Sequence, residues 1–236
     1  MITRYAFDDL GGANHGWLDA KHHFSFASYH DANRMSHGEL LVINDDRIAP
    51  QTGFRMHPHV DMEIITYVRR GAITHEDNQG NRGRTVAGDV QVMSAGTGIY
   101  HSEYNLEDEE TNIYQIWITP KIMGIAPRWA AAEFPKTPVD DQLNLLVSSH
   151  EAGNATLSIN QDARIYAGTI RDGTSLIHKV SGKAYLLVAE GSIAVNGKCG
   201  TKGDGFAISD EPKLILEAQD DSEILIIEVP GLVEAR

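Results

Sequence analysis

The chain has 236 residues, of which 42% are hydrophobic and 22% charged, and its formal net charge is −13. This composition is typical of a soluble globular protein with one large domain or two small ones. So negative a chain is not expected to contact nucleic acid directly or to bind an anionic membrane surface, because both need exposed lysine and arginine. A protein partner with a basic surface stays open.

The N-terminal sequence has no basic segment followed by an apolar run, so we expect no signal peptide. No stretch approaches the roughly 20 apolar residues that cross a bilayer. Cys199 is the single cysteine, which excludes an intrachain disulfide bond. We therefore expect a soluble protein of the cytoplasm.

Short apolar segments between clusters of glycine, asparagine and aspartate predict an all-β fold. In chain order, we expect strands over residues 40–44, 63–68, 89–93, 112–118, 143–148, 184–189, 192–195, 213–217 and 223–229. Residues 77–81 and 196–197 predict hairpin turns, because asparagine and glycine tolerate positive φ. We expect one helix, over residues 128–132, and a linker over residues 134–141.

The two halves of the chain share a pattern. In each half an apolar run ends in a glycine, Gly71 in the first and Gly191 in the second, and a Gly-Asp pair follows. Such a repeat predicts two β-barrels of similar topology. We place the first domain at residues 1–135 and the second at residues 136–236.

Two histidine-containing segments of the first half form a metal-binding pattern. His57 and His59 are two residues apart, so on a strand both imidazoles point to one face. Pro58 between them cannot donate a ladder hydrogen bond, which indicates a sheet edge or a strand start. His101 and Glu103 repeat this spacing after a glycine-rich turn. Three nitrogens and one oxygen around one point suit a first-row divalent metal.

Glu63 is a rival for the fourth ligand. It follows His59 by four residues, so an unbroken strand would turn it to the same face as the histidines. A turn or bulge over residues 60–62 would reset that face. The residue pattern alone leaves Glu63 and Glu103 both open.

Nine of the eleven histidines lie in the first 101 residues. His22, His23 and His30 alternate with aromatic residues, and we expect their segment to be a cap or a strand that packs over the first barrel. Hydrogen bonds to the backbone would account for His15 and His23 without any role as ligands.

The two metal-binding segments resemble the two sequence motifs of the cupin superfamily. The first motif corresponds to Gly53, His57, His59, Glu63 and Gly71, with a shorter spacing from Gly53 to His57 than usual. The second corresponds to Gly88, Gly98, His101 and Asn105. More specifically, the chain is similar to the pirin family in the segments NHGWLD (14–19), HFSFASY (23–29), VINDD (42–46), HPHVDME (57–63) and MSAGTGIYHSEYN (93–105).

The resemblance implies two jelly-roll cupin barrels in one chain, with the metal site in the first. It places one divalent metal on His57, His59, His101 and Glu103, and leaves Glu63 as a supporting carboxylate. Fe(II) is the first choice of metal, and other first-row metals suit the same ligands. Glu103 has two candidate roles, that of a ligand and that of a general base.

The branch that the chain resembles most is the short bacterial one with quercetin 2,3-dioxygenase activity. It implies a flavonol substrate and dioxygen, with a depside and carbon monoxide as products. The family also implies an alternative, an iron-binding regulator that responds to redox state and acts through protein–protein contact. A third hypothesis is a metal-holding cupin with an unrelated small substrate. We expect a monomer, because a bicupin chain resembles an internal dimer.

The second half lacks the metal-binding pattern. His57 and His59 precede Gly71 in the first half. The residues that precede Gly191 by the same distances are Ile177 and Lys179. His178 lies between them and is expected to face the other way. His150 carries no such pattern either, so we expect a degenerate second barrel without metal.

Overall fold

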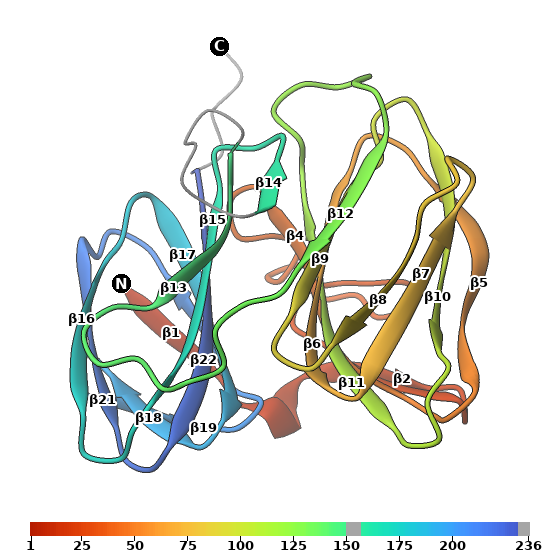
Figure 1. Ribbon diagram of the computed structural model, residues 1–236. Coiled ribbons are helices and arrows are strands. Elements are labelled where there is room, and N and C mark those ends of the chain that lie inside the picture. Colours follow the sequence, from red (N-terminus) through yellow and green to blue (C-terminus); the bar gives the residue numbers. More distant parts are fainter. Residues whose placement is uncertain (150–156, 231–236) are drawn as a thin grey trace.

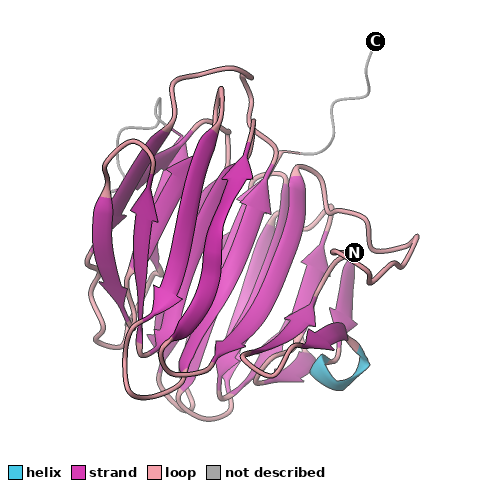
Figure 2. Cartoon of the chain, turned by 90° about the vertical axis from the view of Figure 1, so that its right-hand side faces the viewer, coloured by secondary structure: helices cyan, strands magenta, loops and turns pink. Residues whose placement is uncertain are grey.

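Alternating apolar residues pair into antiparallel strands almost throughout the chain. The computed structural model describes residues 1–149 and 157–230, and His150 lies outside the described residues. Two β-barrels lie side by side, and the helical structure in this part of the chain is one short 3-10 helix, η1 (Phe7–Asp9) (Figures 1 and 2). The predicted all-β bicupin architecture is therefore confirmed. Within the described ranges, no helix has the length and hydrophobicity to span a membrane.

The first barrel is built from two sheets. The seven-stranded sheet has the order β12 (Arg128–Ala132), β9 (Val90–Ser94), β6 (Glu63–Arg70), β11 (Thr111–Ile118), β4 (Leu40–Ile48), β3 (Leu18–His22) and β2 (Gly11–Asn14). The four-stranded sheet has the order β5 (Thr52–His59), β10 (Ile99–Asn105), β7 (Ala72–Asp77) and β8 (Arg82–Val86). This smaller sheet carries His57 and His59 on β5, and His101 and Glu103 on β10.

The second barrel repeats the arrangement. Its seven-stranded sheet has the order β1 (Ile2–Tyr5), β20 (Gly205–Ile208), β17 (Lys183–Glu190), β22 (Ser222–Val229), β15 (Arg164–Ile170), β13 (Asn144–Ser149) and β14 (Leu157–Ile159). Its four-stranded sheet has the order β16 (Ser175–Lys179), β21 (Lys213–Ala218), β18 (Ser192–Val195) and β19 (Lys198–Thr201). The first strand of the chain, β1, thus pairs with β20 and completes the sheet of the other half.

The helix predicted over residues 128–132 is wrong, because this segment forms the edge strand β12. It pairs antiparallel with β9, with Trp129 opposite Met93. Local preference in this alanine-rich run favours a helix, but a run of five residues is too short to be stable as a helix by itself, and the open edge of β9 offers the backbone hydrogen-bond partners. The predicted turn at residues 196–197 is confirmed between β18 and β19, where Asn196 and Gly197 both have positive φ.

The two seven-stranded sheets face each other and share the largest apolar core. Ile65, Tyr114 and Ile116 come from the first barrel, and Tyr185 and Leu187 come from the second. All five are completely buried. The predicted linker at residues 134–141 contains no helix or strand, but it begins with a side chain, Phe134, that is buried in this same core.

A buried arginine links the two barrels across this apolar layer. Arg69 donates a hydrogen bond of 2.6 Å from Nη1 to Asp45 in its own barrel, and one of 2.6 Å from Nη2 to the carbonyl of Ala189 in the other. Its guanidinium also lies over the ring of Tyr114, 4.5 Å from the centroid. A buried guanidinium is tolerated only when it is paired in this way, so these contacts align the two barrels.

Truncation inside the shared core should be costly. Replacing the fully buried Ile65 by alanine removes apolar contacts from the cluster that the two barrels share. We expect a loss of about 2–5 kcal/mol in the free energy of unfolding, measured by denaturant titration. Ile177→Ala is the control, because that side chain is 59% exposed. Equal losses in the two variants would contradict a core shared between the barrels.

Candidate metal centre

The pairing of β5 with β10 brings the two histidine segments together. β5 is the edge strand of its sheet, as Pro58 predicted. In the antiparallel register His101 lies directly opposite His57, and Ile99 lies opposite His59. Since residues two apart share a face, the three imidazoles point into the same side of the barrel.

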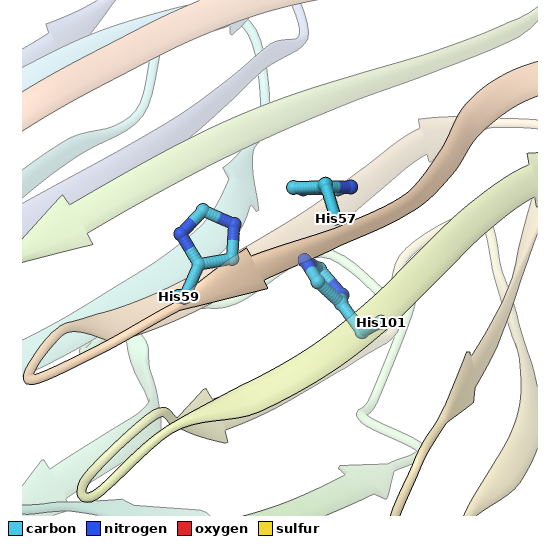
Figure 3. A group of neighbouring side chains, drawn as sticks. All are labelled: His57, His59 and His101. Atoms are coloured by element: carbon cyan, nitrogen blue, oxygen red, sulfur yellow. The ribbon is translucent and has the colours of Figure 1, made fainter.

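His57, His59 and His101 form one cluster (Figure 3). Their candidate ligand atoms all lie within 4.8 Å of one another. The ring centroids are 4.8 Å apart for His57 and His59, and 4.5 Å apart for His57 and His101. His101 is buried, whereas the other two side chains are partly open to the pocket. Among the described residues, this is the group that could hold a metal ion.

The hydrogen bonds of these rings leave nitrogen lone pairs free for a metal. The Nδ1 of His57 donates to the carbonyl of Arg55 at 2.7 Å, so its Nε2 carries the lone pair. The Nε2 of His101 is buried and has no hydrogen-bond partner. A divalent metal would remove that deficit, since neutral imidazole is its commonest nitrogen ligand.

Burial keeps two of these imidazoles uncharged. It lowers the pKa of His59 to about 4, with a smaller contribution from His57. Burial, followed by the neighbouring His57 and His59, lowers the pKa of His101 to about 2. Both side chains are therefore neutral at physiological pH, which is the form that binds metals.

Glu103 lies in the same pocket but is already well supplied with hydrogen bonds. Its Oε1 accepts from Thr66 Oγ1 at 2.9 Å and from Gln91 Nε2 at 2.6 Å. Its Oε2 accepts from Gln115 Nε2. Its oxygens do not belong to the histidine cluster, so its role as fourth ligand stays a prediction.

Glu63 lies away from the cluster. β5 ends at His59, and the turn that follows contains Asp61 with a φ of 46° before β6 begins at Glu63. The carboxylate accepts a hydrogen bond of 2.6 Å from Ser94 Oγ, and burial raises its pKa. The turn therefore resets the face of the strand, and Glu63 does not line the pocket of the histidines.

The cluster lies in a pocket of about 980 Å³ with aromatic walls. Trp17, Phe26, Phe54 and Trp117 line it, and the ring of Trp117 lies edge-on against His59 at 4.9 Å. Such walls suit a flat, largely apolar ligand.

The N-terminal segment closes one side of this pocket, as the sequence predicted. His22 packs between Phe26 and Tyr29, and its Nδ1 is 2.8 Å from Asn44 Oδ1. The ring of His23 instead contacts Tyr185 of the other barrel, with Nδ1 3.0 Å from the hydroxyl. The predicted backbone hydrogen bond of that ring was wrong, because the facing barrel supplies a closer partner.

Sequence analysis missed two buried groups, and Asp46 is the first. It is 2% exposed, it lines the pocket, and its Oδ1 has no hydrogen-bond partner. Burial raises its pKa well above the usual range, and the charges of Asp45 and Glu103 add to the shift. Asn44 and Asp46 are two residues apart on β4 and so share a face, and this spacing was the signal that could have identified Asp46.

The second missed group is His75 on β7. It is 1% exposed, and its ring stacks on Trp129 with centroids 4.8 Å apart. Its nitrogens lie 3.4 Å from His101 Nδ1 and 3.0 Å from Asp77 Oδ2. His75 and Asp77 have the same two-residue spacing that identified the ligands, and this spacing could have found them.

His178 in the second barrel does not face the way that the sequence predicted. Its side chain is buried and its Nε2 lies 2.8 Å from Glu228 Oε1, whereas Ile177 and Lys179 are exposed. Counting from Gly191 fails because the count crosses a turn and a register shift in β17, and either one changes which face a residue takes.

The raised pKa of Asp46 predicts a pH-dependent loss of stability. Above about pH 4 the unfolded carboxyl ionises while the folded one keeps its proton, so stability falls as the pH rises toward the folded pKa. Asp46→Asn has no such loss. We expect the variant, freed of metal by chelation, to melt at a higher temperature than the parent at pH 7, with a gap that narrows toward pH 4. Asp172→Asn, which removes the same charge from an exposed turn, is the control. A gap that stays constant with pH would contradict the shift.

Known proteins resemble this chain over nearly its whole length. The profile of the Pirin family matches residues 5–118, and that of the quercetinase C-terminal cupin domain matches residues 146–229. A pirin-like protein of Caulobacter vibrioides is 53% identical over 231 residues, which cover 97% of this chain and 99% of that protein. The quercetin 2,3-dioxygenase of Escherichia coli K12 is 42% identical over 233 residues, 98% of this chain and 99% of its own.

A solved structure agrees. The bacterial pirin YhhW from Escherichia coli, in complex with nickel(II), superposes with a TM-score of 0.91 at 40% identity, covering 98% of this chain and all of that one. The histidine cluster makes the pocket of this chain a candidate site for a divalent metal. With matching profiles in both halves and close relatives over its full length, the chain belongs to the pirin family.

Proposed function

We propose that this protein is a metal-dependent dioxygenase that cleaves flavonols such as quercetin with dioxygen. The observation that carries the proposal is the three-histidine cluster at one wall of a pocket with aromatic sides. The name of the Escherichia coli relative, quercetin 2,3-dioxygenase, supports the same activity. The acting metal is Fe(II), and His57, His59, His101 and Glu103 hold it.

When bound, the metal supplies the Lewis acidity and the redox chemistry that a deprotonated flavonol needs to react with dioxygen. The protein supplies the shape and the proton chemistry. Trp117 and Phe54 offer ring faces and edges to a flat substrate. His101 and Glu103 are buried at this pocket, and the low dielectric of their surroundings strengthens each polar contact that they make.

Glu103 is the group that receives the substrate proton. Hydrogen bonds from Thr66, Gln91 and Gln115 fix the orientation of its carboxylate. These donors cannot take up a proton themselves, so a proton that leaves the 3-hydroxyl group remains on Glu103. Asp46, whose pKa is raised by burial, also lines the pocket, and in its protonated form it can donate a hydrogen bond to a substrate oxygen.

Turnover of quercetin tests the activity directly. Protein loaded anaerobically with Fe(II) and then exposed to air should consume flavonol absorbance and dioxygen in a one-to-one ratio and release carbon monoxide. Glu103→Gln should lower kcat by about 10²–10⁴-fold, because a positioned base contributes that much. Absence of turnover with Fe(II), Mn(II), Co(II) and Ni(II), each loaded in turn, would refute the proposal.

Metal content tests the ligand set separately. His101→Ala should lose most of the bound metal, because a buried ligand disappears. Glu63→Gln should keep it, because Glu63 bonds to Ser94 outside the pocket. Plasma emission analysis of protein dialysed against Ni(II) gives the ratio of metal to protein. Equal loss in the two variants would make Glu63 a ligand and contradict the assignment.

A further inference from the structure

We propose that His75 and Asp77 are positioning residues that hold His101 in the tautomer whose Nε2 can bind a metal. The inference rests on the metal site of the proposed function, but not on the identity of the substrate. We call these three side chains the His101–His75–Asp77 row.

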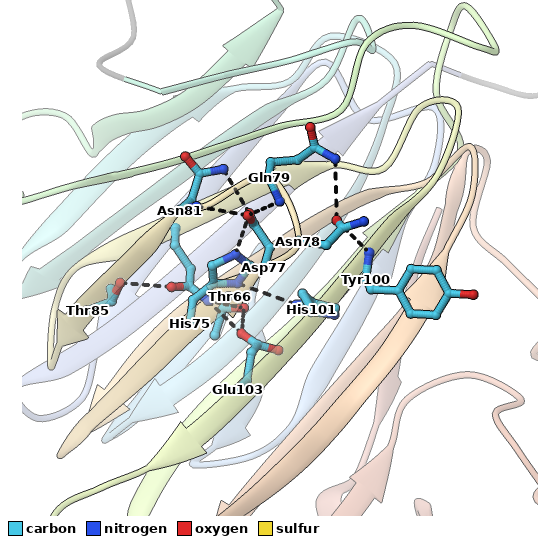
Figure 4. Close-up of polar contacts among 11 residues, drawn as sticks. Thr66, His75, Asp77, Asn78, Gln79, Asn81, Thr85, Tyr100, His101 and Glu103 are labelled. Atoms are coloured by element: carbon cyan, nitrogen blue, oxygen red, sulfur yellow. Dashed lines mark hydrogen bonds and ion pairs between the residues drawn. The ribbon is translucent and has the colours of Figure 1, made fainter.

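The three side chains of the row follow one another in space (Figure 4), and all three are buried. The Nδ1 atoms of His101 and His75 lie 3.4 Å apart, and His75 Nε2 lies 3.0 Å from Asp77 Oδ2. The exposed fractions are 2%, 1% and 9%. The strands β10 and β7 are neighbours, with His101 opposite Asp77 in the register, so the backbone pairing itself sets this row.

The proton positions can be derived from the carboxylate end. Asp77 Oδ1 accepts hydrogen bonds from the backbone amides of Gln79 and Asn81, at 2.9 and 3.0 Å. Its Oδ2 accepts from Asn81 Nδ2 at 2.9 Å. A carboxylate surrounded by donors acts as an acceptor, so His75 Nε2 must carry the hydrogen of its contact.

A metal bound to His101 would require the same hydrogen positions on the two imidazoles. A metal on His101 Nε2 requires the hydrogen of that ring to lie on Nδ1. This N–H points to His75 Nδ1, which accepts it only when the hydrogen of His75 lies on Nε2. Both ends therefore assign the same tautomer to His75, and they leave His101 Nε2 bare. That nitrogen is the one that is buried without a partner.

Packing keeps His75 from turning. Its ring lies almost parallel to Trp129, at an angle of 8°. Gly83 is opposite His75 in the register, and a Cβ atom at that position would collide with the Trp129 ring. The glycine thus admits the indole that fixes the plane of the imidazole.

His57 is also held in the tautomer that leaves Nε2 free for a metal, but by the backbone and not by side chains. His57 Nδ1 donates to the carbonyl of Arg55 at 2.7 Å, so the backbone sets its tautomer. His101 lies deeper and uses two side chains instead. Partners of metal-bound histidines raise metal affinity by about 10–100-fold, and His75 with Asp77 fills that place here.

The test combines a tautomer readout with a binding readout. In metal-free wild-type protein, long-range ¹H–¹⁵N NMR should show His101 with its hydrogen on Nδ1. His75→Phe keeps a ring against Trp129 but removes both nitrogens. We expect a mixture of His101 tautomers in this variant and an affinity for Ni(II), measured by calorimetry, that is about 10–100-fold lower.

His178→Phe is the matched control. His178 is also a buried histidine in contact with a carboxylate, at 2.8 Å from Glu228, but it lies in the second barrel. It should leave Ni(II) affinity and the His101 signals unchanged. Asp77→Asn is the second variant, to be used if His75→Phe does not fold. It replaces one acceptor oxygen by a donor, and it should also give a mixture of His101 tautomers.

Two results would overturn the proposal: wild-type Ni(II) affinity in the folded His75→Phe protein, or a metal-free wild type with the His101 hydrogen on Nε2. A wild type that binds Ni(II) tightly and depends on His75, but that cleaves no flavonol with any metal, would refute the proposed function and support the row. If the wild type bound no metal, the proposed site would fail, and the NMR tautomer would still decide whether His75 orients His101.

Discussion

The antiparallel register between β5 and β10 is the constraint on which the metal centre depends. It sets His101 opposite His57, and strand alternation then brings His59 to the same side. Shifting this register by one residue would turn one pair of side chains out of the barrel. The turn after β5 and the glycine-rich turn before β10 limit such a shift, because both are built from residues with positive φ, Asp61 and Gly96.

Three buried polar atoms without hydrogen-bond partners lie at the pocket of the first barrel, whereas others in this barrel, such as Arg69 Nε and Trp129 Nε1, belong to residues that do not line it. His101 Nε2, Asp46 Oδ1 and Gln115 Oε1 are buried without partners, and all three residues line the pocket. Each unsatisfied group costs about 1–3 kcal/mol. Around them other polar groups are paired, including Glu103 and Asp77. Stability is thus given up where a metal or a substrate would meet the protein, and the surrounding hydrogen bonds hold those groups in place.

The two barrels share an architecture but differ in what fills them. The interior of the second holds an apolar cluster that includes Leu186, Phe206 and Leu216, all completely buried. Its one inward-facing histidine of the described strands, His178, is paired with Glu228. The face that this barrel presents to the first completes the shared core, so it supports the reactive barrel through packing and through contacts such as that of Tyr185 with His23.

The sequence alone determined the β class, the two halves and the candidate ligands, because strand alternation and hairpin turns are local properties. It predicted a helix at residues 128–132 and turned His178 outward, because both depend on which strand lies alongside and where a bulge shifts the register. It also missed β1, whose place in the other barrel depends on a partner some 200 residues away in the chain.

Only the tertiary structure showed what surrounds the two carboxylates and revealed the row behind His101. The residue pattern left Glu63 and Glu103 both open as fourth ligand, and a turn at residues 60–62 directs the first to Ser94, whereas the second lies in the pocket. His75 and Asp77 gain their meaning from β10, which lies beside β7 in the sheet. Residue type and spacing determine which chemistry a side chain can perform. Long-range strand pairing determines which atoms that side chain contacts, and this pairing depends on the packing of the whole chain.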